Sequence, residues 1–482
     1  MSSRSFDRSL RRWSLPLASL LLVHGVAGSA SGADADKYAR NWPAWRGPAG
    51  NGHVLHGNPP LTWSEEKNVK WKVAIPGRGH ATPIIWEDKV FVLTTVPVRE
   101  GARLENLAPQ VAGQAQGQPR PPREGGRPGG GRPGGGGFGG RGPGGGEAPV
   151  TPMAFTVLCL DRATGKPVWE RIARQELPHE RRLQPSNSYS SGSPVTDGER
   201  LYVSFGSHGL HCYDFEGNRI WEKDLGRVNV TFGEGSSPTL AGDALIVLQD
   251  NNGPSFIYAL DKRTGRELWK TERREGSGWT TPLVLQEGDR TEVIVSGSNA
   301  VRAYDAKTGE QIWECAGLGS NPVPMIVANE TALFAMSGHR DETGLAIRRG
   351  RQGNLTGTDA VLWTNKDRIT PYVPSPMLFD DVLLFCQRTS GILSAVHPIT
   401  GKAHYSQERV NELGSVYASP VLAGNRIYWP GQNGATVVLE RSRELKVLAT
   451  NTLNDGFDAS PAVVGDELFL RGREHLYCLV ER

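Results

Sequence analysis

Along most of the chain, hydrophobic residues stand in short runs that are interrupted by turns containing glycine. In residues 256–269 (FIYALDKRTGRELW), apolar and aromatic positions on both sides of a turn at 261–265 predict two short strands. Gly265 suits this turn because glycine adopts a positive φ at no steric cost. Related hairpins recur at 158–169, 212–221, 303–313 and 395–405, each with an aromatic residue four positions after the glycine. The pattern therefore predicts a repeat protein built from β-hairpins.

The repeats share three kinds of residue in fixed register. The tryptophan column contains Trp71, Trp169, Trp221, Trp269, Trp313 and Trp363, with Tyr405 and Leu448 as substitutes. The turns contribute Asp161, Asp214, Asp261 and Asp305, together with Gly165, Gly265, Gly309 and Gly401. An aspartate that recurs before a turn is expected to cap it by accepting backbone N–H bonds, whereas a catalytic aspartate would occur once. We therefore interpret the whole set as structural and assign no catalytic residue.

A second repeated pattern is a small residue followed by proline and then a β-branched or aromatic run. The eight prolines are Pro83, Pro194, Pro238, Pro282, Pro322, Pro376, Pro420 and Pro461. After one long first interval they lie 40 to 54 residues apart, and proline is tolerated at the first residue of a strand. Short strands in a period of this length are typical of propeller blades. The sequence therefore predicts an all-β fold, an eight-bladed β-propeller with four-stranded blades.

The ends of the chain predict how the ring closes. The last repeat, at 460–479, is not followed by a strand that carries tryptophan. Trp71 lies 12 residues before Pro83, much as Trp269 lies 13 residues before Pro282. We therefore expect the N-terminal strand around Trp71 to complete the last blade, which removes two sheet edges.

Before the propeller (67–482) we expect a signal peptide (1–33) and an N-terminal arm (34–66). Basic residues up to Arg12 precede an apolar run at 15–26 and then small residues, which is typical of a secretory signal and too short to span a membrane. A buried core helix is the alternative. We expect export to a periplasm or beyond, and no transmembrane segment. In the arm, Trp42 and Trp45 are interpreted as anchors on the propeller or as contacts for a ligand or partner.

Residues 98–150, inside blade one, are rich in glycine, proline and arginine. Such a composition buries too little apolar surface to offset its ordering entropy, so we expect a disordered loop between the second and third strands. Residues 1–30 and 99–147 each carry a net charge of +3, so the rest of the chain carries −3 of the total +3. The folded part therefore gives no electrostatic reason to expect nucleic-acid binding.

Candidate chemistry is sparse in this sequence. His208, His211 and Cys212 could contribute metal ligands, but a second ligand pair at zinc-site spacing is missing, so we expect no metal. Three cysteines occupy the column that holds alanine in other repeats, which predicts buried small residues and no structural disulfide; they are Cys159, Cys212 and Cys478. An excursion at 339–351 carries Arg348, Arg349 and Arg351, which are either solvated charges or contacts for an anionic partner.

The repeat at 258–269 (YALDKRTGRELW) resembles the PQQ-type repeat of quinoprotein propellers. From Trp42 onward the chain is similar to exported PQQ-like propellers related to the outer-membrane assembly factor BamB. Residues 42–48 (WPAWRGP) and 61–64 (LTWS) resemble a planctomycete-type subgroup. The resemblance covers nearly the whole chain and implies the fold more strongly than a chemistry, because function depends on a site grafted onto the fold.

Three functions are compatible with this resemblance. The first is a non-catalytic scaffold or binding module with an envelope or secreted protein as its partner. The second is a quinoprotein dehydrogenase that holds PQQ and Ca²⁺ in the central funnel and oxidises alcohols or sugars. The third is a carbohydrate-binding protein of the cell envelope. Such dehydrogenases typically carry adjacent cysteines against the cofactor, and no Cys-Cys pair occurs here. We therefore expect a monomeric binding protein with no cofactor, and PQQ as the alternative.

Overall fold

The computed structural model describes residues 32–98 and 151–482, except 55, 181, 182, 184, 185, 366 and 368. Nearly all of the predicted signal peptide and of the insertion at 98–150 lie outside the described residues, and both stay predictions. A short helix, α1 (Gly32–Ala39), precedes the strands. None of the described helices is long and apolar enough to cross a membrane.

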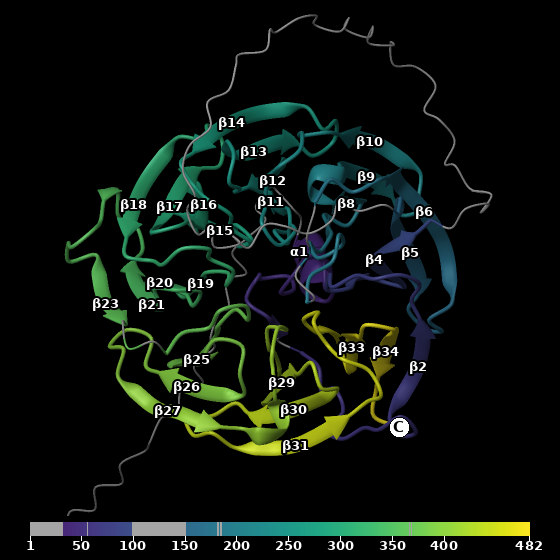
Figure 1. Ribbon diagram of the computed structural model, residues 1–482. Helices are drawn as coiled ribbons and strands as arrows, with labels where there is room; N and C mark the ends of the chain where they lie inside the picture. Colours follow the sequence, from purple (N-terminus) through teal and green to yellow (C-terminus); the bar gives the residue numbers. More distant parts are fainter. Residues whose placement is uncertain are drawn as a thin grey trace, which may run out of the picture.

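The described strands form eight sheets arranged in a ring, as the repeats predict (Figure 1). The innermost strand of each sheet is short and contains no exposed residue, whereas the outermost strand is longer and partly exposed. In chain order, the strands of blades 1 to 4 are β3 (Ile84–Trp86), β4 (Lys89–Pro97), β5 (Met153–Asp161) and β6 (Pro167–Glu176); β7 (Val195–Thr196), β8 (Arg200–Ser204), β9 (Leu210–Asp214) and β10 (Arg219–Lys223); β11 (Thr239–Ala241), β12 (Ala244–Gln249), β13 (Ser255–Asp261) and β14 (Glu267–Arg273); and β15 (Leu283–Glu287), β16 (Arg290–Ser296), β17 (Ala300–Asp305) and β18 (Gln311–Ala316).

The second half of the ring has the same construction. The strands of blades 5 to 8 are β19 (Val327–Ala328), β20 (Ala332–Ser337), β21 (Thr343–Arg348) and β23 (Val361–Asn365); β24 (Met377–Phe379), β25 (Val382–Cys386), β26 (Ile392–Val396) and β27 (Ala403–Arg409); β28 (Val421–Ala423), β29 (Arg426–Pro430), β30 (Ala435–Glu440) and β31 (Val447–Thr452); and β32 (Ala462–Val464), β33 (Glu467–Arg471), β34 (His475–Leu479) and β2 (Val69–Ala74). Two further strands, β1 (His53–Val54) and β22 (Gly353–Asn354), pair in parallel with β28 and β18.

The N-terminal strand closes the ring. β2 pairs antiparallel with β34, and Trp71 lies opposite Cys478. In blades 1 and 2, Cys159 and Cys212 lie opposite the column tryptophans in the same way. All five cysteines are free and buried, which confirms the expectation of no structural disulfide.

Neighbouring blades are joined by contacts between a tryptophan and a glycine. Five tryptophans of the outermost strands lie over the turn glycine of the next blade, where an added Cβ would come within 2.5 to 3.0 Å of the ring; the pairs are Trp71 with Gly165, Trp169 with Gly217, Trp221 with Gly265, Trp269 with Gly309, and Trp363 with Gly401. These glycines have positive φ, so the backbone also favours glycine. Each of the five indole N–H groups donates to a backbone oxygen of the next blade at 2.7 to 3.0 Å. At these five junctions the column therefore fastens one blade to the following one.

The repeated aspartates cap these turns. Asp161 accepts the Thr164 N–H at 2.8 Å, and Asp261 accepts the Thr264 N–H at 2.9 Å. Asp305 and Asp214 accept backbone N–H groups in their own turns. The side-chain hydrogen bond from the threonine is the main reason that the pKa values of Asp161 and Asp261 lie below their ordinary value. The recurrence of these residues therefore has a structural cause.

Two positions in the repeat alignment need correction. In seven blades the predicted proline directly precedes the innermost strand, but in blade 5 Ile326 holds that place and Pro322 lies upstream of it. In blade 7, a bulge places Ala449 opposite Val438, so Ala449 rather than Leu448 occupies the tryptophan column. Each error arose because a plausible residue stood close to a position that has lost the repeat signature.

Blade 5 also differs from the expected excursion at 339–351. Residues 343–348 form the third strand of the blade, β21, rather than a loop. The extra residues follow it, and β22 within them pairs with β18 of blade 4. As blade 5 offers no turn glycine here, the Trp313 indole donates to Glu292 instead, at 3.0 Å.

The N-terminal arm crosses one end of the central channel, and α1 lies near the middle of the ring in Figure 1. Trp42 is fully buried and pairs through its backbone with Ile85 of blade 1. The buried Arg46 guanidinium donates to the Pro376 oxygen of blade 6 at 2.9 Å. Because β1 also pairs with β28 of blade 7, the arm fastens blades from both ends of the chain together.

Candidate functional site

A ring of hydroxyl groups lines the channel where the innermost strands begin. The N–H of Thr82 donates to Ser193 Oγ at 2.9 Å, and the N–H of Ser193 donates to Ser237 Oγ at 2.9 Å. Equivalent bonds join Ser237 to Thr281, Met325 to Ser375, Ser375 to Ser419 and Ser419 to Ser460. Six of the small residues before the prolines are therefore inter-blade acceptors. Met325 is the one member of this ring without a hydroxyl.

The channel widens into a cavity of about 400 Å³, which is the candidate functional site. Trp45 of the arm contributes to its lining, and its indole donates to Ser460 Oγ at 3.4 Å. The other aromatic lining residues are Phe232, Trp279, Tyr372 and Tyr417. Trp279 stacks with Phe232 at 6.5 Å between ring centroids. A volume of this size with aromatic walls is within the range of about 300–1,000 Å³ that is typical of ligand sites.

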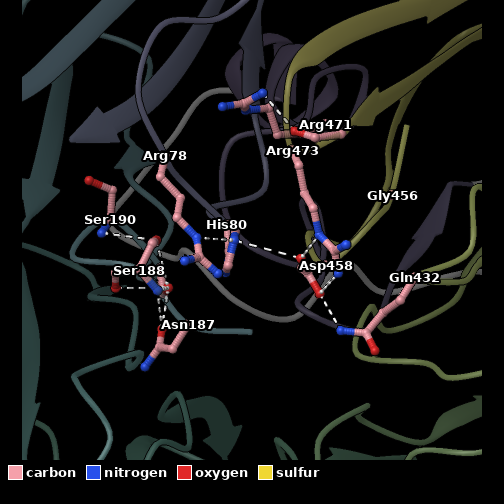
Figure 2. Close-up of polar contacts among 12 residues, drawn as sticks. Arg78, His80, Asn187, Ser188, Ser190, Gln432, Gly456, Asp458, Arg471 and Arg473 are labelled. Atoms are coloured by element: carbon pink, nitrogen blue, oxygen red, sulfur yellow. Dashed lines mark hydrogen bonds and ion pairs between the residues drawn. The ribbon is translucent and has the colours of Figure 1, made fainter. Parts of the chain in front are cut away.

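One wall of the cavity carries His80 and Asp458, whose Nε2 and Oδ2 atoms lie 3.6 Å apart (Figure 2). His80 lies in the connection between β2 and β3, where the N–H groups of His80 and Ala81 both donate to the Ser190 oxygen. Gly79 lets this connection lie against β4, because an added Cβ would come 2.3 Å from the Leu93 oxygen. The two side chains come from opposite ends of the chain and meet at the ring closure.

Asp458 is held on its other side by Arg473 and Gln432 (Figure 2). Arg473 Nε donates to Oδ2 at 2.8 Å, and Gln432 Nε2 donates to Oδ1. Burial alone would raise the pKa of Asp458, but the hydrogen bond from Arg473 and the nearby charges outweigh it, so the pKa lies below its ordinary value. The carboxylate is therefore charged at neutral pH.

His80 is held in its neutral form. Burial lowers the pKa of His80 to about 4, and the nearby Asp458 charge raises it only in part. Arg78 Nε donates to His80 Nε2 at 3.5 Å, which agrees with a deprotonated Nε2. A neutral imidazole beside a carboxylate resembles the histidine and aspartate of a nucleophilic triad. Among the described residues, however, no hydroxyl hydrogen-bonds to the His80 ring. The pair can therefore exchange hydrogen bonds with a ligand, but it has no nucleophile beside it among the described hydroxyl groups.

The cavity does not fit the Ca²⁺ that accompanies PQQ in a quinoprotein. Calcium takes about six to eight oxygen ligands, of which several are usually carboxylates. Among the described residues that line the cavity, Asp458 is the only carboxylate, and both its oxygens already accept bonds from Arg473 and Gln432. The donor set therefore cannot supply a calcium site without breaking these bonds.

The partner contacts expected from the sequence lie at separate places. Trp45 lines the cavity, whereas Trp42 is completely buried and its ring is inaccessible to a partner. The three arginines of blade 5 lie outside the cavity: Arg349 is bound to Glu287, Arg351 to Asp359, and Arg348 to the Asp359 oxygen. Arg349 therefore links blades 4 and 5, whereas Arg348 and Arg351 lie on the surface.

Sequence reasoning missed His80, Asp458 and Trp279. Each of them stands two residues before the small residue that precedes a blade proline, in the connection that enters that blade. That shared place beside the channel was the one signal that could have identified them.

The comparisons with known proteins agree with this fold. The family described as outer membrane protein assembly factor BamB matches residues 154–281 and 255–482. BamB of Shewanella oneidensis is 23% identical over 292 residues, which cover 58% of this chain and 65% of that protein. The chain thus spans less than two thirds of the length of this curated relative. The planctomycete-type subgroup stays a prediction.

Solved structures show the same propeller fold in enzymes. Quinohemoprotein alcohol dehydrogenase from Comamonas testosteroni matches with a TM-score of 0.59 and 11% identity, covering 94% of this chain and 82% of that chain. A europium-containing methanol dehydrogenase matches with a TM-score of 0.56 and 9% identity, covering 91% and 90%. At such identities the likeness is one of fold alone. By its repeats, its ring closure and the family match over 154–482, the chain belongs to the family of the outer membrane protein assembly factor BamB.

Proposed function

We propose that the protein is an exported, non-catalytic binding module whose central cavity receives a segment of a partner protein in the cell envelope. The observation that carries this proposal is the lining of the cavity. Its aromatic walls and hydrogen-bonding groups suit a peptide segment, and the one carboxylate among its described lining residues is already paired. Tyrosine and tryptophan are also the residues that most often contribute binding energy at protein interfaces.

The family supports a role in protein interaction, since the relative from Shewanella oneidensis is named as an assembly factor of the outer membrane. Export rests on the sequence of residues 1–33, which has the pattern of a cleaved signal peptide. Mass spectrometry of the mature protein from its native host tests this part of the proposal. An N-terminus near residues 30–34 is expected, and an intact residue 1 contradicts export through this segment.

Site-specific photo-crosslinking tests the binding surface. A photoreactive amino acid in place of Tyr417, in the cavity wall, is expected to give one adduct with an envelope protein. The matched control carries the same amino acid at Leu268, which is 43% exposed on an outermost strand. Trp279→Ala should abolish the Tyr417 adduct, because it removes part of the opposite wall. Equal adducts from both positions, or none from position 417, contradict the proposal.

The dehydrogenase alternative has its own test. The purified protein is incubated with PQQ and Ca²⁺, and dye reduction is followed with small alcohols and aldose sugars. We expect no turnover, because the cavity lacks the oxygen donors that calcium requires. Saturable turnover that depends on both additions would replace the binding proposal with a catalytic one.

A further inference from the structure

Three side chains at the junction of blades 1 and 2 lie close enough to share one metal ion. His179 and Glu180 follow β6, and His208 ends the short 3₁₀ helix η1 (Gly206–His208) between β8 and β9. One ligand atom from each of the three residues lies within 4.8 Å of the other two. His208 Nε2 is 2.9 Å from Glu180 Oε1, and His179 Nδ1 is 3.7 Å from Glu180 Oε2. The side chains of His208 and Glu180 are only 2% and 7% exposed.

The outer nitrogen of each imidazole has its own partner. His208 Nδ1 lies 2.6 Å from Glu176 Oε1, and His179 Nε2 lies 3.3 Å from the Val228 oxygen. When these outer nitrogens carry the protons, the lone pairs of His208 Nε2 and His179 Nδ1 both face the Glu180 carboxylate. Histidines that bind metals almost always donate the other ring N–H to a carboxylate or a backbone oxygen, as both do here.

The spacing suits a small tetrahedral ion. Ligands at about 2.0–2.1 Å from zinc are separated by about 3.3 Å. With Glu180 Oε2 as the ligand atom, the distances to His208 Nε2 and His179 Nδ1 are 3.1 and 3.7 Å, within a few tenths of an ångström of this value. All three ligand atoms lie within 4.8 Å of one another. Beside Glu180 and His208 lies a cavity of about 30 Å³, lined also by Ser188 and Glu234. This cavity has room for a water molecule, which is the usual fourth ligand of a zinc site with three protein ligands.

We propose that His179, Glu180 and His208 bind a divalent transition-metal ion of the zinc class. Imidazole nitrogens favour zinc, cobalt, nickel and copper, whereas magnesium and calcium favour oxygen ligands alone. Glu176 is a positioning residue that fixes the His208 ring. The sequence predicted no metal here, because His179 and Glu180 lie 28 residues or more before His208 and have no recognisable spacing.

The ion would tie the chain after β6 to the β8–β9 connection of blade 2. Residues farther along the connection between β6 and β7, among them Asn187 and Ser191, line the central cavity. Metal binding at this site would therefore stiffen one wall of that cavity. This consequence is independent of the partner, and the metal site stands whether or not the binding proposal is correct.

Metal titration of the full chain tests the proposal. The affinity tag is removed, the protein is treated with a chelator, and Co²⁺ or Zn²⁺ is added. We expect one equivalent of metal, the visible absorption of tetrahedral Co²⁺, and a higher Tm with Zn²⁺. His179→Ala should remove the spectrum and weaken binding at least 100-fold. Glu176→Gln should weaken binding by about 10–100-fold while keeping the stoichiometry, as loss of a partner that orients a ligand does.

A matched control is His339→Asn in the wall of the central cavity, which should bind zinc like the unchanged protein. Far-UV circular dichroism verifies that each variant is folded, and His179 is the safest ligand to replace because its side chain is 20% exposed. The alternative is that His208 is a protonated imidazolium between Glu176 and Glu180. Zinc binding that is absent, equal in His179→Ala, or matched by Mg²⁺ would overturn the metal site.

Discussion

The contact between Trp221 of blade 2 and Gly265 of blade 3 can be tested by a double-mutant cycle. A Cβ at position 265 would lie 2.8 Å from Trp221 Cε3, and φ of Gly265 is +71°. Gly265→Ala should therefore carry two costs, about 1–2 kcal/mol for the left-handed backbone and about 1–3 kcal/mol for overpacking against the ring.

Gly242→Ala, in the same blade, separates these costs. Its φ is +62° and no heavy atom lies within 4 Å of an added Cβ, so only the backbone cost of about 1–2 kcal/mol applies. Trp221→Phe should cost about 1–2 kcal/mol through the lost bond to the Lys262 oxygen and the smaller ring. It also removes ring atoms that obstruct a Cβ at position 265.

The double variant Trp221→Phe/Gly265→Ala should therefore lose at least about 1 kcal/mol less than the sum of the two single variants. The free energy of unfolding is measured in guanidinium by far-UV circular dichroism, since fluorescence changes when a tryptophan is removed. Costs that add within about 0.5 kcal/mol would refute the argument that the ring excludes a side chain at 265. Equal costs for Gly265→Ala and Gly242→Ala would refute it as well.

Three other changes test the closure, the insertion and the titration of the cavity. Deleting residues 34–75 removes β2 and should abolish cooperative thermal unfolding, and an unchanged transition would show that the ring closes without it. Replacing 98–150 by a short Gly/Ser linker should leave the Tm nearly unchanged, because each doubling of loop length costs only about 0.6 kcal/mol; a large loss would show that this segment packs on the propeller. The His80 pKa of about 4 lies below its unfolded value of 6.5, so the unfolded state binds more protons and stability should fall, by up to about 3 kcal/mol, as the pH drops from 6.5 through 4. His80→Gln should flatten this decline between pH 7 and 4.5 in urea titrations, and an equally steep decline would contradict the assigned role of His80.

The sequence was informative wherever a blade repeats the same contact. Trp169 and Gly217, for example, recur because five of the junctions place a tryptophan ring over a bare backbone turn. Prediction failed where the contact was replaced, as at Ile326 and Ala449, because a position is then defined only by strand pairing. In blade 5 the charges of Arg348 and Arg349 suggested a loop although residues 343–348 form a strand.

The candidate site was less predictable for a different reason. His80 and Asp458 are 378 residues apart and meet only because β2 returns to the last blade. Each stands at a repeat position, two residues before the small residue of its blade, that other blades fill with different side chains, so the repeat marks the position but not its chemistry. The closure follows from the strand assignment, but which side chains it brings together depends on residues that each occur once.

The closure by β2 also has a consequence for the order in which the chain can mature during synthesis. Residues 69–74 leave the ribosome about 400 residues before their partner strand at 475–479. At a synthesis rate of about 5–20 residues per second, this delay lasts about 20–80 s. During that time β2 has no partner, and its row of unpaired N–H and C=O groups is free to pair with other chains. A nascent chain would therefore gain from a chaperone that covers its first strand until the last blade has emerged.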